Sequence, residues 1–204
     1  MRAELTEEIK AVAREVGMVS SAVYRYYPSR DDLLTALIVD AYDAVGEAAE
    51  QADAACDRAD LFGRAMATFR AIRAWAVANP QEYALVYGSP VPGYAAPTDT
   101  IDPAARVAVV MLQIMVDGVA SGALGETGSI STTRVVRSDF AGLRHAFATS
   151  VPDDLVSLAL LAWTNLFGSI SFELFGHFHN IIHDDEGFFD LQMGRALSFL
   201  RPEG

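Results

Sequence analysis

Apolar positions along most of this chain follow the spacing of helices, and no stretch shows the sustained alternation of apolar and polar residues that marks a strand. Proline and glycine fall at the breaks between the apolar segments. The pattern predicts an all-α fold with loops at 88–100 and 125–138. The expected helices are 30–54, 58–78, 81–88, 102–122, 139–149, 152–176 and 187–200.

Several of these helices carry recognisable start and stop signals. Ser29 precedes Arg30-Asp31-Asp32, so its hydroxyl can cap a helix whose third residue is acidic, as in a capping box. Asn79-Pro80 should end the second helix, because proline cannot continue a helix. Asp102-Pro103 combines a capping residue with a first-turn proline and should begin the helix that runs to 122.

The segment "LVSLALLAWTNLFGSISFELF" at 155–175 is long enough to cross a membrane. It contains Asn165 and Glu173, however, and both of its flanks are acidic where a membrane span favours Lys or Arg on one side. A helix that is apolar almost all round is otherwise buried in protein. We therefore expect no membrane span, and we expect a partner chain to cover part of this helix.

The apolar surface of the helix expected at 152–176 predicts a homodimer that forms through residues 152–176 and 187–200. Gly168 and Ser169 would allow close helix approach, and two copies of each segment would form a four-helix contact. The apolar residues that should supply the contact are Leu155, Leu158, Leu161, Ala162, Leu166, Phe172 and Phe175.

Charge is unevenly distributed along the 204 residues, whose net charge is −12. Residues 1–30 hold five basic and four acidic side chains, whereas the remainder holds ten basic and 23 acidic ones. A polyanion such as DNA would therefore meet the first segment and be repelled by the rest. The single cysteine, Cys56, cannot form an internal disulfide, which indicates the reducing cytoplasm.

Residues 13–30 have the spacing of a helix-turn-helix. Ala13, Gly17 and Val23 supply a small residue at the helix crossing, a permissive turn and an apolar residue that holds the second helix onto the first. The second helix would direct Ser20, Ser21 and Tyr24 to base edges and sugar-phosphate, with Arg25, Tyr26 and Arg30 near phosphates. An ordinary helical corner with an exposed tyrosine is the alternative, and the charge distribution favours DNA binding over it.

The stretch "VAREVGMVSSAVYRYYPSRDDLL" resembles the DNA-binding segment of TetR-type transcriptional regulators. By position, the resemblance implies groove-facing roles for Ser20, Ser21, Ala22 and Tyr24, and backbone contacts for Tyr26 and Arg30. The stretches "NPQEYALVYGSPVPGYAAP" and "AWTNLFGSISFELFGHFHN" are similar to the C-terminal domain of one branch of that family. The resemblance thus implies a DNA-binding domain at 1–45 and an effector-binding and dimerisation domain at 46–204.

The chain departs from the family pattern at its start. The family has a full helix and a short loop before the position of Val12, but only eleven residues precede Val12 here. We expect that a stretch near residues 10–11 is absent from this sequence. The alternative is a true deletion of the first helix, which would expose the apolar sides of the next two helices and put DNA binding in doubt.

Large side chains at helical spacing are candidates for the wall of an effector cavity. Core packing is the alternative for each of them, while the resemblance implies a cavity between helices that takes a small apolar effector. Gln113, Asp117 and Asn165 are polar residues in apolar helices that could orient such a ligand or be satisfied core groups. The proposed ligand-binding residues are Trp75, Tyr83, Tyr87, Met111, Met115, Asp117, Trp163 and Phe167.

No motif for enzyme chemistry is present, since the sequence contains no nucleophile elbow, phosphate loop or metalloprotease spacing. His179 and His183 are four residues apart and could share a metal on a helix face, but we favour histidines that interact with a helix C-terminus and predict neither metal nor cofactor. The sequence predicts a ligand-responsive, homodimeric transcriptional repressor that binds operator DNA. A helical small-molecule-binding dimer without DNA binding is the alternative, and a small helical enzyme using the histidines is a remote third.

Overall fold

The computed structural model describes residues 26–125 and 132–201, and this part of the chain contains helices and no strand. The prediction of an all-α fold is therefore confirmed. The elements are α3 (Arg30–Ala54), α4 (Leu61–Ala78), α5 (Pro80–Tyr87), the 3₁₀ turn η1 (Thr98–Thr100), α6 (Ile101–Ser121), α7 (Arg134–Ala146), α8 (Asp153–Leu174), α9 (Asp185–Ala196) and the 3₁₀ turn η2 (Ser198–Leu200).

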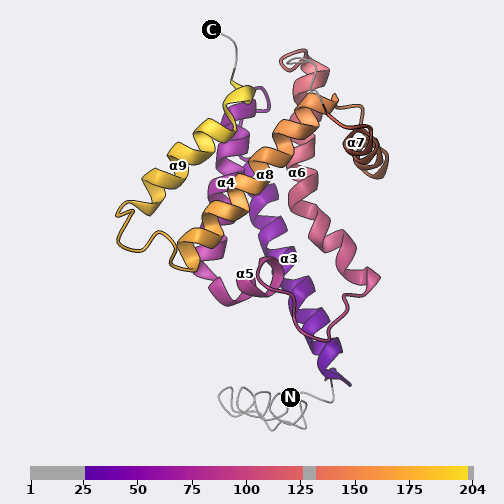
Figure 1. Ribbon diagram of the computed structural model, residues 1–204, viewed down its shortest axis with the longest axis vertical. Helices are drawn as coiled ribbons and strands as arrows, with labels where there is room; N and C mark the ends of the chain where they lie inside the picture. Colours follow the sequence, from indigo (N-terminus) through magenta and orange to yellow (C-terminus); the bar gives the residue numbers. More distant parts are fainter. Residues whose placement is uncertain (1–25, 126–131, 202–204) are drawn as a thin grey trace.

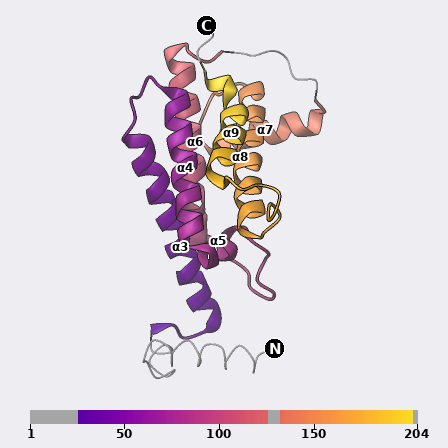
Figure 2. The same cartoon turned by 90° about the vertical axis from the view of Figure 1, so that its left-hand side faces the viewer.

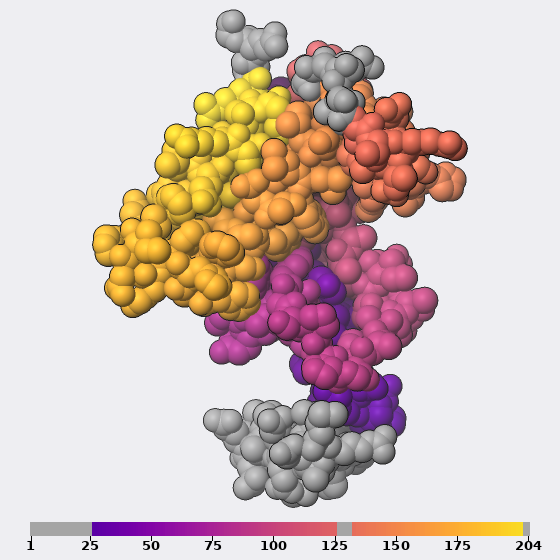
Figure 3. Space-filling model, viewed as in Figure 1, coloured from indigo at the N-terminus to yellow at the C-terminus, as the bar shows by residue number. Residues whose placement is uncertain are grey.

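The helices form a bundle in which α3 packs against both α4 and α6 (Figure 1). Helices α8 and α9 pack against each other, and α4 contacts both of them (Figure 2). The atoms of α8 and α9 form one continuous region in the upper part of the face shown in Figure 3. The beginning of α3 projects beyond α5, and the predicted division at residues 45 and 46 falls inside this unbroken helix (Figure 1).

Local sequence signals set the helix ends, and the start of α3 and the end of α4 lie where they were predicted. The backbone N–H of Asp32 donates to Ser29 Oγ (3.1 Å) and the Ser29 N–H donates to Asp32 Oδ2 (2.9 Å), which completes a capping box. Helix α4 ends at Asn79-Pro80, and Asn79 Nδ2 donates to the Trp75 carbonyl (2.9 Å). Helix α6 begins slightly earlier than predicted, at Ile101, and ends where Gly122 adopts a left-handed φ of 74°.

One helix boundary expected from the sequence is wrong, and one alternative that the sequence left open for the histidines is not met. Helix α7 begins at Arg134 and not at 139, because the Thr133 hydroxyl accepts a hydrogen bond from the Val136 N–H (3.3 Å) and caps it inside the predicted loop. His179 and His183 do not share a helix face, since α8 ends at Leu174 and a run of turns with a left-handed Gly176 follows. Within residues 26–125 and 132–201, no cluster of three metal-ligating side chains occurs.

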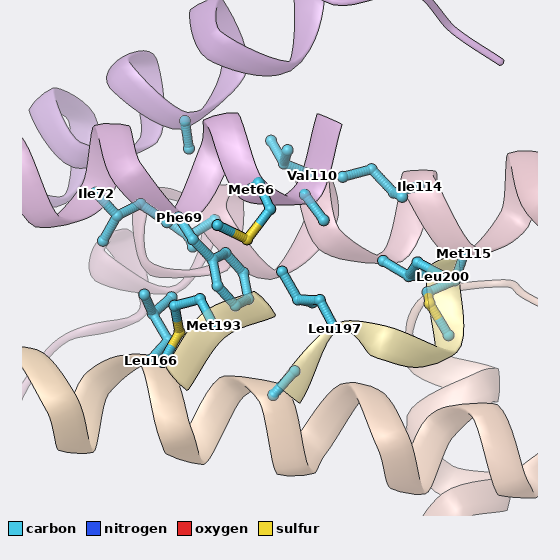
Figure 4. Packing of buried hydrophobic residues seen from close by; sticks show 14 of the residues in the cluster. Met66, Phe69, Ile72, Val110, Ile114, Met115, Leu166, Met193, Leu197 and Leu200 are labelled. Carbon is cyan, nitrogen blue, oxygen red and sulfur yellow. The ribbon is translucent and has the colours of Figure 1, made fainter. Parts of the chain in front are cut away.

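The core lies between α4, α6, α8 and α9 (Figure 4). Each helix contributes apolar side chains from the face that it turns inward, so burial follows the helical period. The labelled core residues are Met66, Phe69, Ile72, Val110, Ile114, Met115, Leu166, Met193, Leu197 and Leu200. This packing fixes the relative positions of α6 and α8, which form the walls of the cavity described below.

A buried arginine ties α3, α4 and α6 together at one end of the bundle. Arg64 of α4 is fully buried, and its Nε donates to Asp53 Oδ1 (2.7 Å) at the end of α3. Its Nη1 lies 2.9 Å from Asp117 Oδ2 of α6, while Arg58 bonds the same two carboxylates. Burial raises the pKa of the Asp53 carboxyl, but the bonds from Arg64 and Arg58 outweigh it and hold that pKa below its usual value.

A second arginine joins α6 to the middle of α3. Arg106 donates to Asp43 Oδ1 (2.8 Å) and, through Nη2, to Glu50 Oε2 (2.7 Å). Its side chain crosses Gly46, where an added Cβ would lie only 2.8 Å from Arg106 Cβ. The missing side chain at Gly46 therefore permits the close approach of the two helices.

Candidate ligand-binding site

A cavity of about 270 Å³ lies between α6, α7 and α8, and almost all of its surface is apolar. Its size and composition are those of a site for a small apolar molecule. The lining residues are Ala108, Met111, Leu112, Met115, Leu143, Arg144, Phe147, Thr149, Val151, Val156, Ala159, Leu160 and Trp163.

Two helices build most of the wall with the same spacing. Helix α6 contributes positions 108, 111, 112 and 115, and α8 contributes 156, 159, 160 and 163. Both sets follow the steps of three and four that place side chains on one helix face. Helix α7 closes the third side with Leu143, Arg144 and Phe147, and Phe140 is its one buried residue.

An aromatic chain leads from the cavity wall to α3. The Trp163 ring lies 4.8 Å from that of Phe167, and Phe167 lies 4.1 Å from Tyr87 of α5. Tyr87 in turn meets Tyr42 of α3 edge-on at 5.9 Å, and Tyr83 packs beside it at 5.3 Å. These ring contacts join α8, α5 and α3 into one packed aromatic layer.

The two tyrosines of α5 stay neutral and differ in how their hydroxyls are satisfied. Tyr83 donates to the Phe167 carbonyl (3.0 Å) and lies 2.8 Å from Ser171 Oγ, and burial raises its pKa despite the Ser171 hydrogen bond. Burial, with smaller effects of Tyr42 and Tyr83, also raises the pKa of Tyr87. Among the described residues, the buried Tyr87 hydroxyl has no hydrogen-bond partner.

The structure brings some of the proposed ligand-binding residues together and separates others. Met111, Met115 and Trp163 line the cavity. Phe167, Tyr87 and Tyr83 lie behind Trp163 in the aromatic layer, and Trp75 packs at the edge of the core.

None of the three polar candidates is among the lining residues. Asp117 is bound by Arg58 and Arg64, and it accepts a hydrogen bond from Gln113 Nε2 (2.7 Å). The exposed Asn165 donates to the Leu161 carbonyl (2.9 Å). Burial raises the pKa of Asp117, but the hydrogen bonds from Gln113, Arg64 and Arg58 lower it by more, and the net pKa lies below its usual value. This carboxylate therefore belongs to the ion-pair network.

Sequence reasoning missed the side of the cavity that α7 and the following turn supply. Leu143 and Phe147 continue an apolar series that begins at Val136 and Phe140, with steps of four, three and four. This series was the available signal for a helix that covers something apolar. It could not show that the covered surface is a cavity, because that depends on where α6 and α8 lie.

The proposed DNA-binding residues lie mostly outside the described part of the chain. This applies to Ser20, Ser21, Ala22, Tyr24 and Arg25. Tyr26 is 70% exposed, as a residue that contacts a partner must be. Arg30 begins α3, and its guanidinium lies 4.0 Å from Asp31, at the outer limit of an ion pair.

The surface of α8 carries an exposed stripe, defined here as Leu161, Asn165, Gly168, Phe172 and Phe175. These positions alternate steps of four and three, the spacing of a helix–helix contact. The expectation that Leu155, Ala162 and Leu166 belong to a dimer contact is wrong, because all three are fully buried within the chain. Helix α9, which packs against α8, carries the exposed Leu191.

Two helical segments, Thr98–Ser121 and Asp153–Leu174, are long and apolar enough to cross a membrane by length and composition alone. In α8, one face packs in the core of the bundle and the exposed stripe lies on a different face, because each stripe residue from Leu161 to Gly168 precedes a buried residue by one position. Its apolar character is therefore accounted for by packing and by one exposed contact surface.

Comparison with known proteins identifies the family. Residues 65–196 match the model for the tetracyclin repressor-like, C-terminal domain. HTH-type transcriptional regulators Mb1846 of Mycobacterium bovis and Rv1816 of Mycobacterium tuberculosis are each 40% identical over 196 residues, which cover 94% of this chain and 82% of the relative.

Solved structures show the same fold. The crystal structure of regulatory protein SCO4313 is 33% identical, with a TM-score of 0.70, over 93% of this chain and 84% of that one. A protein of unknown function from Rhodococcus sp. RHA1 shares the fold at 20% identity and a TM-score of 0.65, over 95% and 82%. The chain belongs to the tetracyclin repressor-like, C-terminal domain family, and it is a TetR-type, helix-turn-helix DNA-binding transcriptional regulator and not an enzyme.

Proposed function

We propose that this regulator is a homodimeric repressor that a small apolar effector releases from operator DNA. The observation that carries the proposal is the position of α6, which lines the cavity with one face and is bound to α3 through Arg106, which pairs with Asp43 and Glu50. A ligand that changes the packing of α6 therefore also acts on α3, the helix that directly follows the predicted DNA-binding segment in the sequence.

The two faces of α6 have different chemistry. Met111 and Met115 face the cavity, and their flexible thioethers can repack around a ligand at little cost. Arg106 and Asp117 bind carboxylates and arginines of the α3 and α4 side. Movement on the apolar face of α6 is thereby coupled to the charged contacts that hold α3.

The aromatic layer supplies a second contact between the cavity and α3. Trp163 lines the cavity, and Phe167 and Tyr87 connect it to Tyr42. A ligand that displaces the Trp163 indole must move its neighbours, because packed rings leave little free space. Both routes end on α3.

The mechanism is a two-state linkage. In the DNA-bound state, the two recognition helices of a dimer must match successive major grooves, about 34–36 Å apart. An effector that binds the other state more tightly shifts the population away from this spacing and weakens DNA binding. The dimer contact that sets the spacing would form through residues 152–176 and 187–200, which hold the exposed stripe of α8 and the helix α9 that packs against α8. Such a regulator works where the chromosome lies, in the cytoplasm and away from the membrane.

Titration with neutral apolar compounds, such as linear alcohols, should quench the fluorescence of Trp163 and release bound operator DNA at the same concentrations. Trp163→Ala should lose both responses while keeping its melting temperature within a few degrees, since Trp163 is only half-buried. Trp75→Phe, which changes the other tryptophan, is the matched control and should respond like the wild type. Fluorescence quenching without any change in DNA affinity would contradict the repressor mechanism.

Arg30→Ala should weaken binding to operator and to unrelated DNA alike. The slope of log affinity against log salt concentration should become shallower by about one unit, because one phosphate contact is lost. Competition binding at several salt concentrations measures both quantities. An unchanged slope would remove Arg30 from the DNA interface.

A further inference from the structure

Among the described residues that line the cavity, Arg144 is the one that carries a charge. It lies in the last turn of α7, and its Nη1 forms an ion pair with Asp153 in the first turn of α8. The exposed fractions of the two side chains are 27% and 28%, so the pair is only partly open to solvent. It joins two of the three helices that enclose the cavity.

The cavity surface is almost entirely apolar although an arginine contributes to it. Arg144 therefore presents mainly its aliphatic stem to the cavity, while its guanidinium forms an ion pair with Asp153. Asp153 does not itself line the cavity. A ligand in the cavity thus meets the apolar part of an arginine whose charge is already compensated.

This arrangement has a consequence for the charge of the ligand. A carboxylate placed beside the pair would leave one uncompensated negative charge against an almost entirely apolar wall, where it loses part of its hydration, which is costly. Elsewhere in the chain, Arg106 binds two carboxylates, but Asp43 and Glu50 are about half exposed and keep their hydration. Asp153 is only 28% exposed and lies beside an almost entirely apolar wall, so a second carboxylate at Arg144 would lose more of its hydration and is unfavourable.

We propose that Asp153 masks Arg144 and thereby makes the cavity select neutral apolar ligands over carboxylates with the same apolar body. At the packing density of proteins, about 270 Å³ holds a body of roughly a dozen non-hydrogen atoms. The proposal rests on the function proposed above, because it assumes that this cavity is the effector site. It assigns to Asp153 a role in specificity through the exclusion of anions.

The test compares 1-decanol with decanoate, which share their chain and differ in charge, at about pH 7.5, where a carboxylic acid is ionised. Binding is followed by the fluorescence of Trp163 in a Trp75→Phe background and checked by calorimetry. The wild type should bind decanol at least about tenfold more tightly than decanoate. Asp153→Asn, which leaves Arg144 unmasked, should gain about tenfold or more in decanoate affinity and change little toward decanol.

Two further variants separate masking from a general change in charge. Asp139→Asn removes an exposed carboxylate of α7 that does not line the cavity, and it should keep the wild-type preference. Adding Arg144→Met to Asp153→Asn should abolish the gain toward decanoate, because the cation is then gone. The wild-type comparison stands even if a variant fails to fold.

Equal affinity of the wild type for decanol and decanoate would overturn the proposal, as would an Asp153→Asn protein that folds and still excludes decanoate. Both results would leave the cavity in place as an effector site. Failure of the wild type to bind either compound, by fluorescence and by calorimetry, would instead remove the effector site itself and this inference with it.

Discussion

Replacing Arg64 with methionine should lower the free energy of unfolding by about 3–5 kcal/mol. The side chain is fully buried and bonds Asp53 and Asp117, so its removal leaves two carboxylates without their central partner. Arg58, whose side chain is half exposed, can compensate only in part. Urea unfolding followed by circular dichroism measures the loss.

The matched control is Arg70→Met. Arg70 forms a two-bond pair with Asp190, but the two side chains are 57% and 32% exposed, and exposed pairs contribute at most about 1 kcal/mol. A small loss from both substitutions would show that the Arg64 network is not a main source of stability.

The same network fixes the direction of the acid response. The pKa values of Asp53 and Asp117 are lower in the folded protein than their usual values. Their contribution to stability is therefore fully present above the unfolded pKa of about 3.9, and it is lost as the pH falls through the lower folded values. The wild type should accordingly lose stability below about pH 4.

Placing a charge on the exposed stripe, as in Phe172→Asp, should convert the dimer to a monomer at micromolar concentration. Phe172 is 50% exposed in the single chain, so the change should leave the fold intact while it puts an unpaired carboxylate into the contact. Operator affinity should fall by at least about 100-fold, because a monomer has only one DNA-binding domain and can occupy only one of the two half-sites of the operator. Light scattering and DNA binding measure the two effects.

Ile101→Asp is the control for the dimer experiment. Ile101 is an apolar residue that is 60% exposed on α6, outside the exposed stripe, and its substitution should leave the dimer unchanged. Leu166→Asp would be uninformative, since Leu166 is buried in the core and its loss should unfold the chain. A Phe172→Asp protein that remains dimeric would place the subunit contact elsewhere.

Helix ends were predictable where a few neighbouring residues decide them. Ser29 and Asp32 form their cap locally, and Pro80 terminates α4 through its own ring. The start of α7 was missed because Thr133 lies in a stretch whose Ser, Thr and Gly content is typical of loops. The capping residue Thr133 therefore determines where α7 begins, whereas the composition of the surrounding stretch does not.

The candidate site was predictable in its chemistry and only partly in its membership. Methionine and tryptophan at helical spacing correctly indicated Met111, Met115 and Trp163 as residues of facing helices. Asp117 also lies on α6, but two residues beyond Met115 it points to another side of the helix and meets Arg64. Deciding between these outcomes requires the rotation of each helix about its axis, which the sequence alone does not specify.

The unbroken course of α3 makes it a lever. Its 25 residues extend about 37 Å at 1.5 Å per residue, and Arg64 holds one end of it through Asp53. A tilt of about 5° about that end would carry the Arg30 end through about 3 Å, more than the tolerance of a hydrogen bond to a phosphate. In the mechanism proposed above, a ligand in the cavity would need to shift α6 by only a fraction of an ångström near Asp53 to break DNA contacts at the opposite end of α3.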